Sequence, residues 1–163
     1  MIITFKLTYK MSIATPDKIS LMAETNGDLL RENSQNTINE RAKYTANTGI
    51  VLISTANSSL SGDGTLGTVL TAAANGTLIK TITINAIGNT TQGMVRLFIY
   101  DGNSVTNLID EFEIPPSTAL GTYPAYTITY EVNYNLKAGY VLKASTQNSE
   151  SFVIIAEGLN WTY

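Results

Sequence analysis

The sequence predicts an all-β protein, folded as an antiparallel two-sheet sandwich, from three observations. From Gly49 onward, short runs rich in β-branched and aromatic residues recur every eight to twelve residues. Glycine, asparagine, aspartate, serine and proline separate these runs, as they do in turns. The connections are too short to hold the crossover helices that parallel strands require. A chain of 163 residues also fits one domain with a single core.

The first predicted element is a strand over residues 2–9. Its apolar side chains alternate with threonine and lysine at the period of a half-buried strand, and they are Ile3, Phe5, Leu7 and Tyr9. The lysines interrupt an apolar run that is already too short for a signal peptide. If these four side chains do not pair within their own sandwich, they form an exposed docking strand that augments the sheet of another subunit.

Residues 11–48 lose this alternation. Their apolar residues are too sparse for a stable isolated helix, and their spacing does not sustain a heptad repeat. An arm is therefore expected here, and whether residues 12–48 are helical or extended stays open. We accordingly predict a docking strand and arm over residues 1–48 and a β-sandwich domain over residues 49–163.

Eight strands are predicted in the sandwich, over residues 50–54, 66–72, 77–87, 94–101, 108–114, 126–134, 140–146 and 152–161. Alternation assigns the inward positions of two of them, and these are Leu78, Ile82, Ile84 and Ala86, then Val95, Leu97 and Ile99. Turns are predicted at Asp101-Gly102 and at residues 137–139. Pro115-Pro116 is predicted to end a strand, because proline has no backbone N–H to donate to a neighbouring strand.

The strand over residues 126–134 has one aromatic face, formed by Tyr126, Tyr130 and Tyr134 together with Ile128 and Val132. Rings in a row can stack on sugar faces. Aliphatic residues on the same face more often indicate a core or a subunit interface. We therefore expect this face to be buried in the core or between subunits, with a sugar-binding platform as the alternative.

The composition excludes most familiar catalytic sites. The chain has no histidine and no cysteine, so a Ser-His-Asp triad, a thiol nucleophile and a histidine-bound zinc are all excluded. No cofactor and no metal are expected. Charged residues make up only 14% of the chain and the net charge is −3, which disfavours nucleic acid as a partner. No run approaches the roughly 20 apolar residues of a membrane span.

Two groups of acidic residues are candidates for catalysis or metal binding. In a strand, Glu111 and Glu113 share a face that Asp110 does not, and a solvated edge strand is favoured over a glycosidase pair. Asp63 and Asp101 lie in glycine-containing turns that lack EF-hand spacing, so turn chemistry is favoured over calcium binding.

Three segments resemble a family of small virion structural proteins of tailed bacteriophages. They are residues 76–102, 113–146 and 154–161. The features that carry the resemblance are the turn from Gly88 to Gly93, the strand from Val95 to Ile99 that leads into Asp101-Gly102, the proline-bearing link, Ala138-Gly139-Tyr140 and Ala156-Glu157-Gly158. These are scaffold features, and none of them is a catalytic signature.

The resemblance implies a jelly-roll-like antiparallel sandwich, and it does not include residues 1–48. The residue pattern there adds an N-terminal strand and an extended or partly helical arm. Such a module is displayed on the virion as a head fibre or a capsid decoration protein, including in phages of the crAss-like group. It is implied to bind the capsid shell and to be a homo-oligomer, with a trimer favoured by analogy, made in the bacterial host cytoplasm. The chain is thus expected to be a non-enzymatic virion structural protein, attached through its N-terminal segment.

The sequence is also compatible with other functions. The alternatives are a carbohydrate-binding module that uses exposed tyrosines or Trp161 with Asn89 and Asn103, and a structural protein of the tail or baseplate. A small hydrolase that uses Glu111 and Glu113 is the least favoured.

Overall fold

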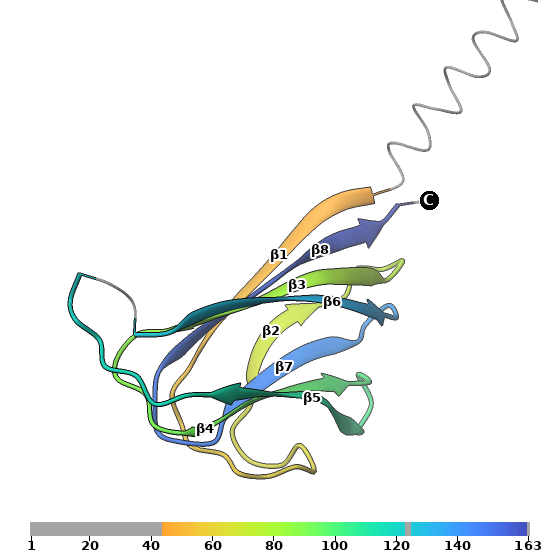
Figure 1. The fold of residues 1–163 in the computed structure, drawn as a ribbon. Helices are drawn as coiled ribbons and strands as arrows, with labels where there is room; N and C mark the ends of the chain where they lie inside the picture. Colours follow the sequence, from red (N-terminus) through yellow and green to blue (C-terminus); the bar gives the residue numbers. More distant parts are fainter. Residues whose placement is uncertain (1–43, 123–124, 163) are drawn as a thin grey trace, which may run out of the picture. The chain divides into compact units, whose positions relative to one another are not determined.

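The computed structural model describes residues 44–122 and 125–162. Figure 1 shows these residues as two layers of strands. The strands are β1 (Tyr44–Ile53), β2 (Gly67–Thr71), β3 (Thr77–Ala86), β4 (Gly93–Tyr100), β5 (Thr106–Ile114), β6 (Thr127–Leu136), β7 (Val141–Thr146) and β8 (Phe152–Trp161). The predicted strand over residues 2–9 and the arm up to residue 43 lie outside the described residues.

The eight strands form two four-stranded antiparallel sheets. Sheet A has the order β1-β8-β3-β6, and sheet B has the order β2-β7-β4-β5. The pairs β1–β8, β2–β7, β3–β6 and β4–β5 are nested in the sequence, as in one long hairpin wound around a core. This winding is the jelly-roll topology. The predicted all-β, jelly-roll-like two-sheet sandwich is therefore confirmed.

The core lies between the two sheets and consists of aliphatic and phenylalanine side chains. Both layers contribute fully buried residues, among them Ile82 and Ile154 from sheet A and Leu97 and Leu142 from sheet B. The predicted inward set of β4 is confirmed, because Val95 and Leu97 are buried and Ile99 packs against the same cluster.

The predicted inward set of β3 needs one correction. Ile82, Ile84 and Ala86 are buried as expected, but Ile79 occupies the core and Leu78 is only half-buried. The cause is a β-bulge, since the register of β3 against both of its neighbours shifts between Ile79 and Thr81. An extra residue in a strand reverses which face the following side chains occupy.

Strand β1 begins at Tyr44, five residues before the expected start of the sandwich at Gly49. Residues 44–48 were expected in the arm, but they pair with β8 in unbroken register. The Tyr44 ring lies 4.8 Å from the Trp161 ring, and Asn47 donates a 2.9 Å hydrogen bond to Asn160. Residues 44–48 have no alternation of apolar and polar side chains. Only their pairing with β8 therefore identifies them as part of a strand.

The sandwich is closed along the side where β1 meets β2. A Cβ atom at Gly49 would lie 2.1 Å from the backbone oxygen of Val69, and one at Gly67 would lie 2.7 Å from Ile53. Only glycine allows the backbones of two strands to approach this closely. The two sheets are therefore brought together at this edge by residues without side chains.

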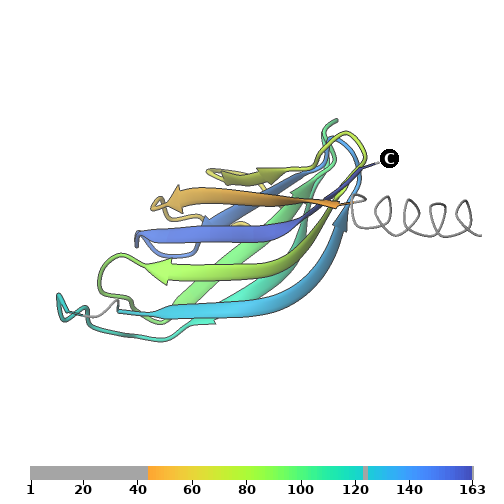
Figure 2. The same ribbon diagram turned by 90° about the horizontal axis from the view of Figure 1, so that it is seen from above.

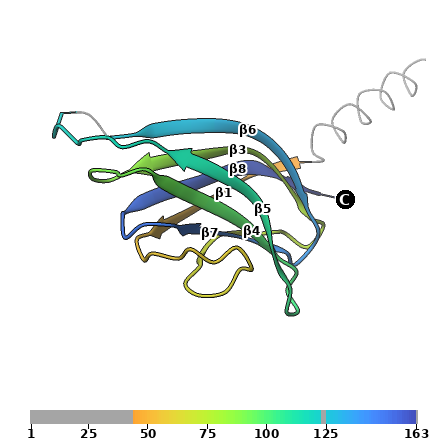
Figure 3. The ribbon, with the colours of Figure 1, turned by 60° about the horizontal axis from the view of Figure 1, so that its bottom comes forward.

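The loop of residues 54–66 covers the outer face of sheet B (Figures 1 and 3). The Asn57 backbone pairs with Thr146 on β7, and Gly62 lies against Thr106 on β5. Phe98 lies on the opposite face of β4 from the core residues Val95 and Leu97. It is nevertheless fully buried, beneath this loop. The chain thus covers this second apolar surface with a segment of its own.

Candidate functional site

Four candidate docking residues predicted from the sequence, Ile3, Phe5, Leu7 and Tyr9, lie outside the described residues. The other predicted set, Tyr126, Tyr130 and Tyr134, lies in the described sandwich. These three tyrosines are half-buried and pack against the core cluster from the inner face of sheet A. We refer to them as the tyrosine row.

The tyrosine row occupies the side of the sandwich opposite to the closed β1–β2 edge. There the edge strand β6 of sheet A runs beside the edge strand β5 of sheet B (Figure 3). The rings of Tyr130 and Phe112 lie 4.3 Å apart, and the Tyr134 hydroxyl donates a 2.6 Å hydrogen bond to the Asp110 carboxylate. Side chains of the two edge strands therefore connect the sheets along this side.

Both ends of the row have phenols that resist ionisation. Burial raises the pKa of Tyr134 well above its usual range, and the hydrogen bond with Asp110 and the negative charge of that carboxylate add to the effect. Burial, together with a hydrogen bond to Tyr130, raises the pKa of Tyr126 to about 12. Both hydroxyls stay protonated at neutral pH and act as hydrogen-bond donors or acceptors.

This geometry limits what the tyrosine row can do. Rings that pack against the core and against Phe112 have part of their surface covered already. A stacking platform for sugars requires a ring face that is open to solvent. The row is better suited to joining the two sheets than to binding a ligand by ring stacking.

The three carboxylates of β5 have three separate partners. Glu111 binds the Nε of the buried Arg96 at 2.7 Å, Glu113 accepts a 3.4 Å hydrogen bond from Gln92, and Asp110 binds Tyr134. Glu111 and Glu113 point to the outer face of sheet B while Asp110 does not, as the alternation predicted. Each carboxylate therefore has a structural contact in the described sandwich.

The two aspartates in glycine-containing turns have local partners. One oxygen of Asp101 accepts hydrogen bonds from the backbone N–H groups of Asn103, Ser104 and Val105, which lower the pKa of Asp101. Asp63 accepts a 2.8 Å hydrogen bond from Ser61. Within residues 44–122 and 125–162, no group of three or more acidic side chains is placed to hold a metal ion. The turn role predicted for Asp101 is borne out by these contacts.

The remaining residues named for sugar binding are spread over the molecule. Asn89 accepts a hydrogen bond from the backbone of Ala119, Asn103 lies in the turn after β4, and Trp161 packs on Tyr44 at the end of sheet A.

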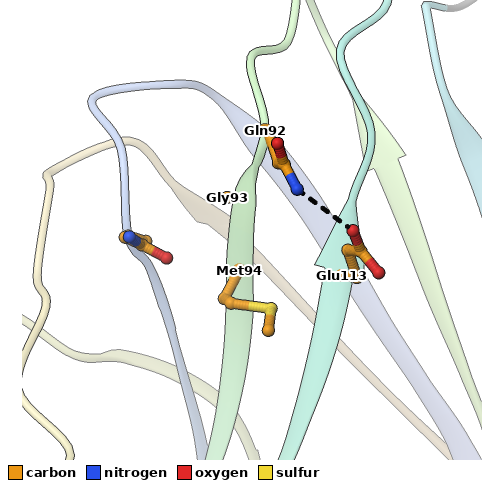
Figure 4. Close-up of a pocket in the computed structure, with 5 residues that line it drawn as sticks. Gln92, Gly93, Met94 and Glu113 are labelled. Carbon is orange, nitrogen blue, oxygen red and sulfur yellow. Dashed lines mark hydrogen bonds between the residues drawn. The ribbon is translucent and has the colours of Figure 1, made fainter.

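An open pocket of about 330 Å³ lies at one end of sheet B, on its outer face (Figure 4). Its lining consists of Gln92, Gly93, Met94, Glu113 and Gln147. Two amides and one carboxylate beside a methionine side chain can exchange hydrogen bonds with a polyhydroxylated ligand. The sequence patterns did not indicate this pocket, because its residues come from three separate segments.

The most exposed apolar surface of the sandwich is the outer face of sheet A. We call it the sheet A patch, and its members are Ile50 and Leu52 of β1, Val153 and Ile155 of β8, and Ile87, which follows β3. Cross-strand register places Leu52 beside Val153 and Ile50 beside Ile155. Figure 2 looks onto this face, and no other segment of the described chain crosses it.

A signal for this patch was present in the sequence. The segments IVLI at residues 50–53 and FVII at residues 152–155 are apolar at every position. In a strand, continuous apolar residues place apolar side chains on both faces. Inward positions were predicted for other strands, and the second apolar face of β1 and β8 was not predicted.

Comparisons with known proteins assign no family. No family model matches the chain, and no curated protein matches it. Among solved structures, the chain is similar to the CBM22-1–GH10 modules of endo-1,4-β-D-xylanase 10B from Clostridium thermocellum, solved with xylohexaose. The sequences are 10% identical with a TM-score of 0.38, and the match covers 74% of this chain and 26% of that one. This chain thus spans about a quarter of the chain it matches.

The described residues contain no helix that is long and apolar enough to cross a membrane.

Proposed function

We propose that this chain is a non-enzymatic structural protein of a phage virion, displayed on the capsid surface and attached through its N-terminal segment. One observation carries the proposal: both sheets and the core between them are assembled from residues 44–161. Residues 44–161 contain the eight strands that a jelly roll requires. The 43 residues that precede them, which include the alternating apolar residues of positions 2–9, are then assigned to attachment.

The sandwich has the character expected of a displayed module. The outward positions of β3 and β6 are mostly threonine and asparagine, and the carboxylates of β5 have partners that belong to the scaffold. The resemblance of residues 76–102, 113–146 and 154–161 to small virion proteins adds the virion location to the proposal.

The test compares binding of purified chains to particles of the phage that carries this protein. The full chain should co-sediment with particles that lack it, whereas a chain without residues 1–43 should remain in solution with an unchanged melting temperature. Within the segment, Phe5→Asp with Leu7→Asp should abolish binding, because it places charge on the apolar face of the docking strand. The matched control is Thr4→Asp with Thr8→Asp, which adds the same charge to the other face and should bind.

Two results would contradict the proposal. Binding by the truncated chain at the level of the full chain would place attachment on the sandwich. Absence of the full chain from purified particles, measured by mass spectrometry, would remove the virion role altogether.

A second candidate function is carbohydrate binding, and the pocket lined by Gln92, Glu113 and Gln147 is the observation that favours it. Glycan-array screening of the full chain decides this candidate. Binding that is lost in Glu113→Ala, and retained in Glu131→Ala on the other sheet, would support it.

A further inference from the structure

The two sheets of the sandwich differ in what covers their outer faces. On sheet B, the loop of residues 54–66 crosses the face and leaves Phe98 fully buried. On sheet A, the side chains of Ile50, Leu52 and Ile87 are 64%, 58% and 58% exposed. Contiguous exposed aliphatic residues of this kind mark an interaction surface in a folded protein.

The two cross-strand rows of sheet A that contain Ile50 and Leu52 carry no charge. Two cross-strand rows span the sheet, Leu52–Val153–Asn85–Thr127 and Ile50–Ile155–Thr83–Thr129. Half of these side chains are aliphatic, and the others are threonine or asparagine. The Thr83 and Thr129 hydroxyls already bind each other at 2.8 Å. Charged side chains on this face begin one row further on, with Glu157 and Glu131.

This distribution favours a second copy of the chain as the partner. A chain with a net charge of −3 repels its copy wherever acidic residues meet, and the two rows bring none together. A strongly charged partner would find no opposite charge in these rows to pair with. Aliphatic side chains on β1 and β8 beside uncharged polar ones on β3 and β6 give a face with few charges, and depletion of charge is typical of an interface core.

The size of the face is sufficient for a weak dimer. Four strands spaced about 4.8 Å apart, each about 30 Å long, cover roughly 600 Å². A standard interface buries about 800 Å² on each partner. Two sheets that pack face to face use the same surface on both subunits, so the contact is isologous and closes with two copies.

We propose that the outer face of sheet A is a self-association surface, through which two copies of this chain pack with their sheet A patches in contact. This inference goes beyond the attachment role and does not depend on it. The resemblance to virion proteins favours a trimer instead, so the mass of the complex distinguishes the two expectations.

The first experiment is sedimentation of the full chain from about 5 to about 500 μM, a range suited to an interface of this size. The wild-type chain should pass from monomer to dimer. Ile50→Thr combined with Leu52→Thr should remain monomeric throughout, because it removes both exposed aliphatic side chains that β1 contributes to the patch and puts β-branched residues, which favour strands, in their place. Leu60→Thr combined with Leu120→Thr, which changes two exposed loop residues, is the matched control and should dimerise.

The second experiment uses the absence of cysteine from the chain. The thiol of a full-length Leu52→Cys variant is the only one in the protein, so its alkylation rate reports exposure of the patch. The rate should fall about tenfold between the dilute and the concentrated sample as the dimer forms. The rate of a Leu120→Cys variant should stay constant.

Several outcomes would overturn the proposal. They are a wild-type chain that is monomeric at the highest concentration, a trimeric mass, association that survives the patch substitutions, and an alkylation rate of the Leu52→Cys variant that does not depend on concentration. Association that survives the substitutions would locate the contact elsewhere, including residues 1–43. If the patch substitutions lower the melting temperature, the alkylation rates decide the question.

Discussion

At the scale of single residues, the most informative contact is the hydrogen bond from Tyr134 to Asp110. The two residues belong to edge strands of different sheets, β6 and β5. Their bond therefore joins the layers on the side that lacks the close backbone approach seen at Gly49. The alternation of β5 predicts that Asp110 points away from the face that Glu111 and Glu113 share. The sequence did not indicate that Asp110 binds Tyr134, because the two residues lie on different sheets.

Replacing Tyr134 with phenylalanine should destabilise the sandwich by about 1 kcal/mol at pH 7, the usual contribution of one hydrogen bond. It should also change how stability depends on pH. Folding raises the pKa of Tyr134 above its usual value near 10. The contribution that this shift makes to the free energy of unfolding is therefore fully present below pH 10, and it is lost as the pH rises through the folded-state pKa. Wild-type stability should consequently fall above pH 10, and Tyr134→Phe should remove part of that fall.

Urea denaturation at pH 7 and at pH 11 provides the measurement. Asp110→Asn is the control, because it keeps an acceptor for the Tyr134 hydroxyl and removes the charge. Burial is the largest cause of the raised pKa, so this variant should retain most of the alkaline loss. Equal alkaline losses in wild type and Tyr134→Phe would show that Tyr134 is not responsible.

At the scale of elements, the sequence located the strands well and their irregularities poorly. Runs of β-branched residues marked all eight strands, and Pro115-Pro116 marked the end of β5 at Ile114. The bulge of β3 near Lys80 was not predicted, because a bulge depends on two partner strands. It is the reason that Ile79 occupies the core in place of Leu78.

Replacing Gly49 with alanine should destabilise the protein by about 2 kcal/mol. The new Cβ would lie 2.1 Å from the Val69 backbone oxygen and 2.6 Å from the Leu70 Cβ, so β1 and β2 would have to separate. Gly88→Ala is the matched control, since no atom lies within 4 Å of the Cβ position there. Thermal denaturation of both variants checks the prediction, and a similar melting temperature for the two would contradict it.

At the scale of the whole molecule, the boundary of the sandwich decides which truncated chains fold. Residues 44–48 belong to β1 and pair with residues 157–161 of β8. They supply the ring contact between Tyr44 and Trp161 and the hydrogen bond between Asn47 and Asn160. A cut made after Thr48, at the boundary expected from the sequence, would therefore remove half of an edge strand.

Deleting residues 1–43 should leave the melting temperature of the sandwich unchanged. Deleting residues 1–48 should lower it by roughly 5 to 10 °C, because an aromatic pair and a hydrogen bond together contribute about 2 kcal/mol. Differential scanning calorimetry of the two truncated chains and the full chain tests this. Equal melting temperatures for both truncated chains would mean that residues 44–48 contribute nothing to the fold.

By itself, the sequence determined the all-β class, the eight strands and most of the core, because hydrophobic alternation and turn residues are local properties of the chain. The absence of histidine and cysteine likewise determined which chemistry is excluded. Only the tertiary structure decided which strands are neighbours and that the tyrosine row lies where β5 and β6 meet. It also decided that, among the described residues, a loop covers the outer face of sheet B and none covers that of sheet A. These features depend on contacts between residues far apart in the sequence, and local patterns do not specify such contacts.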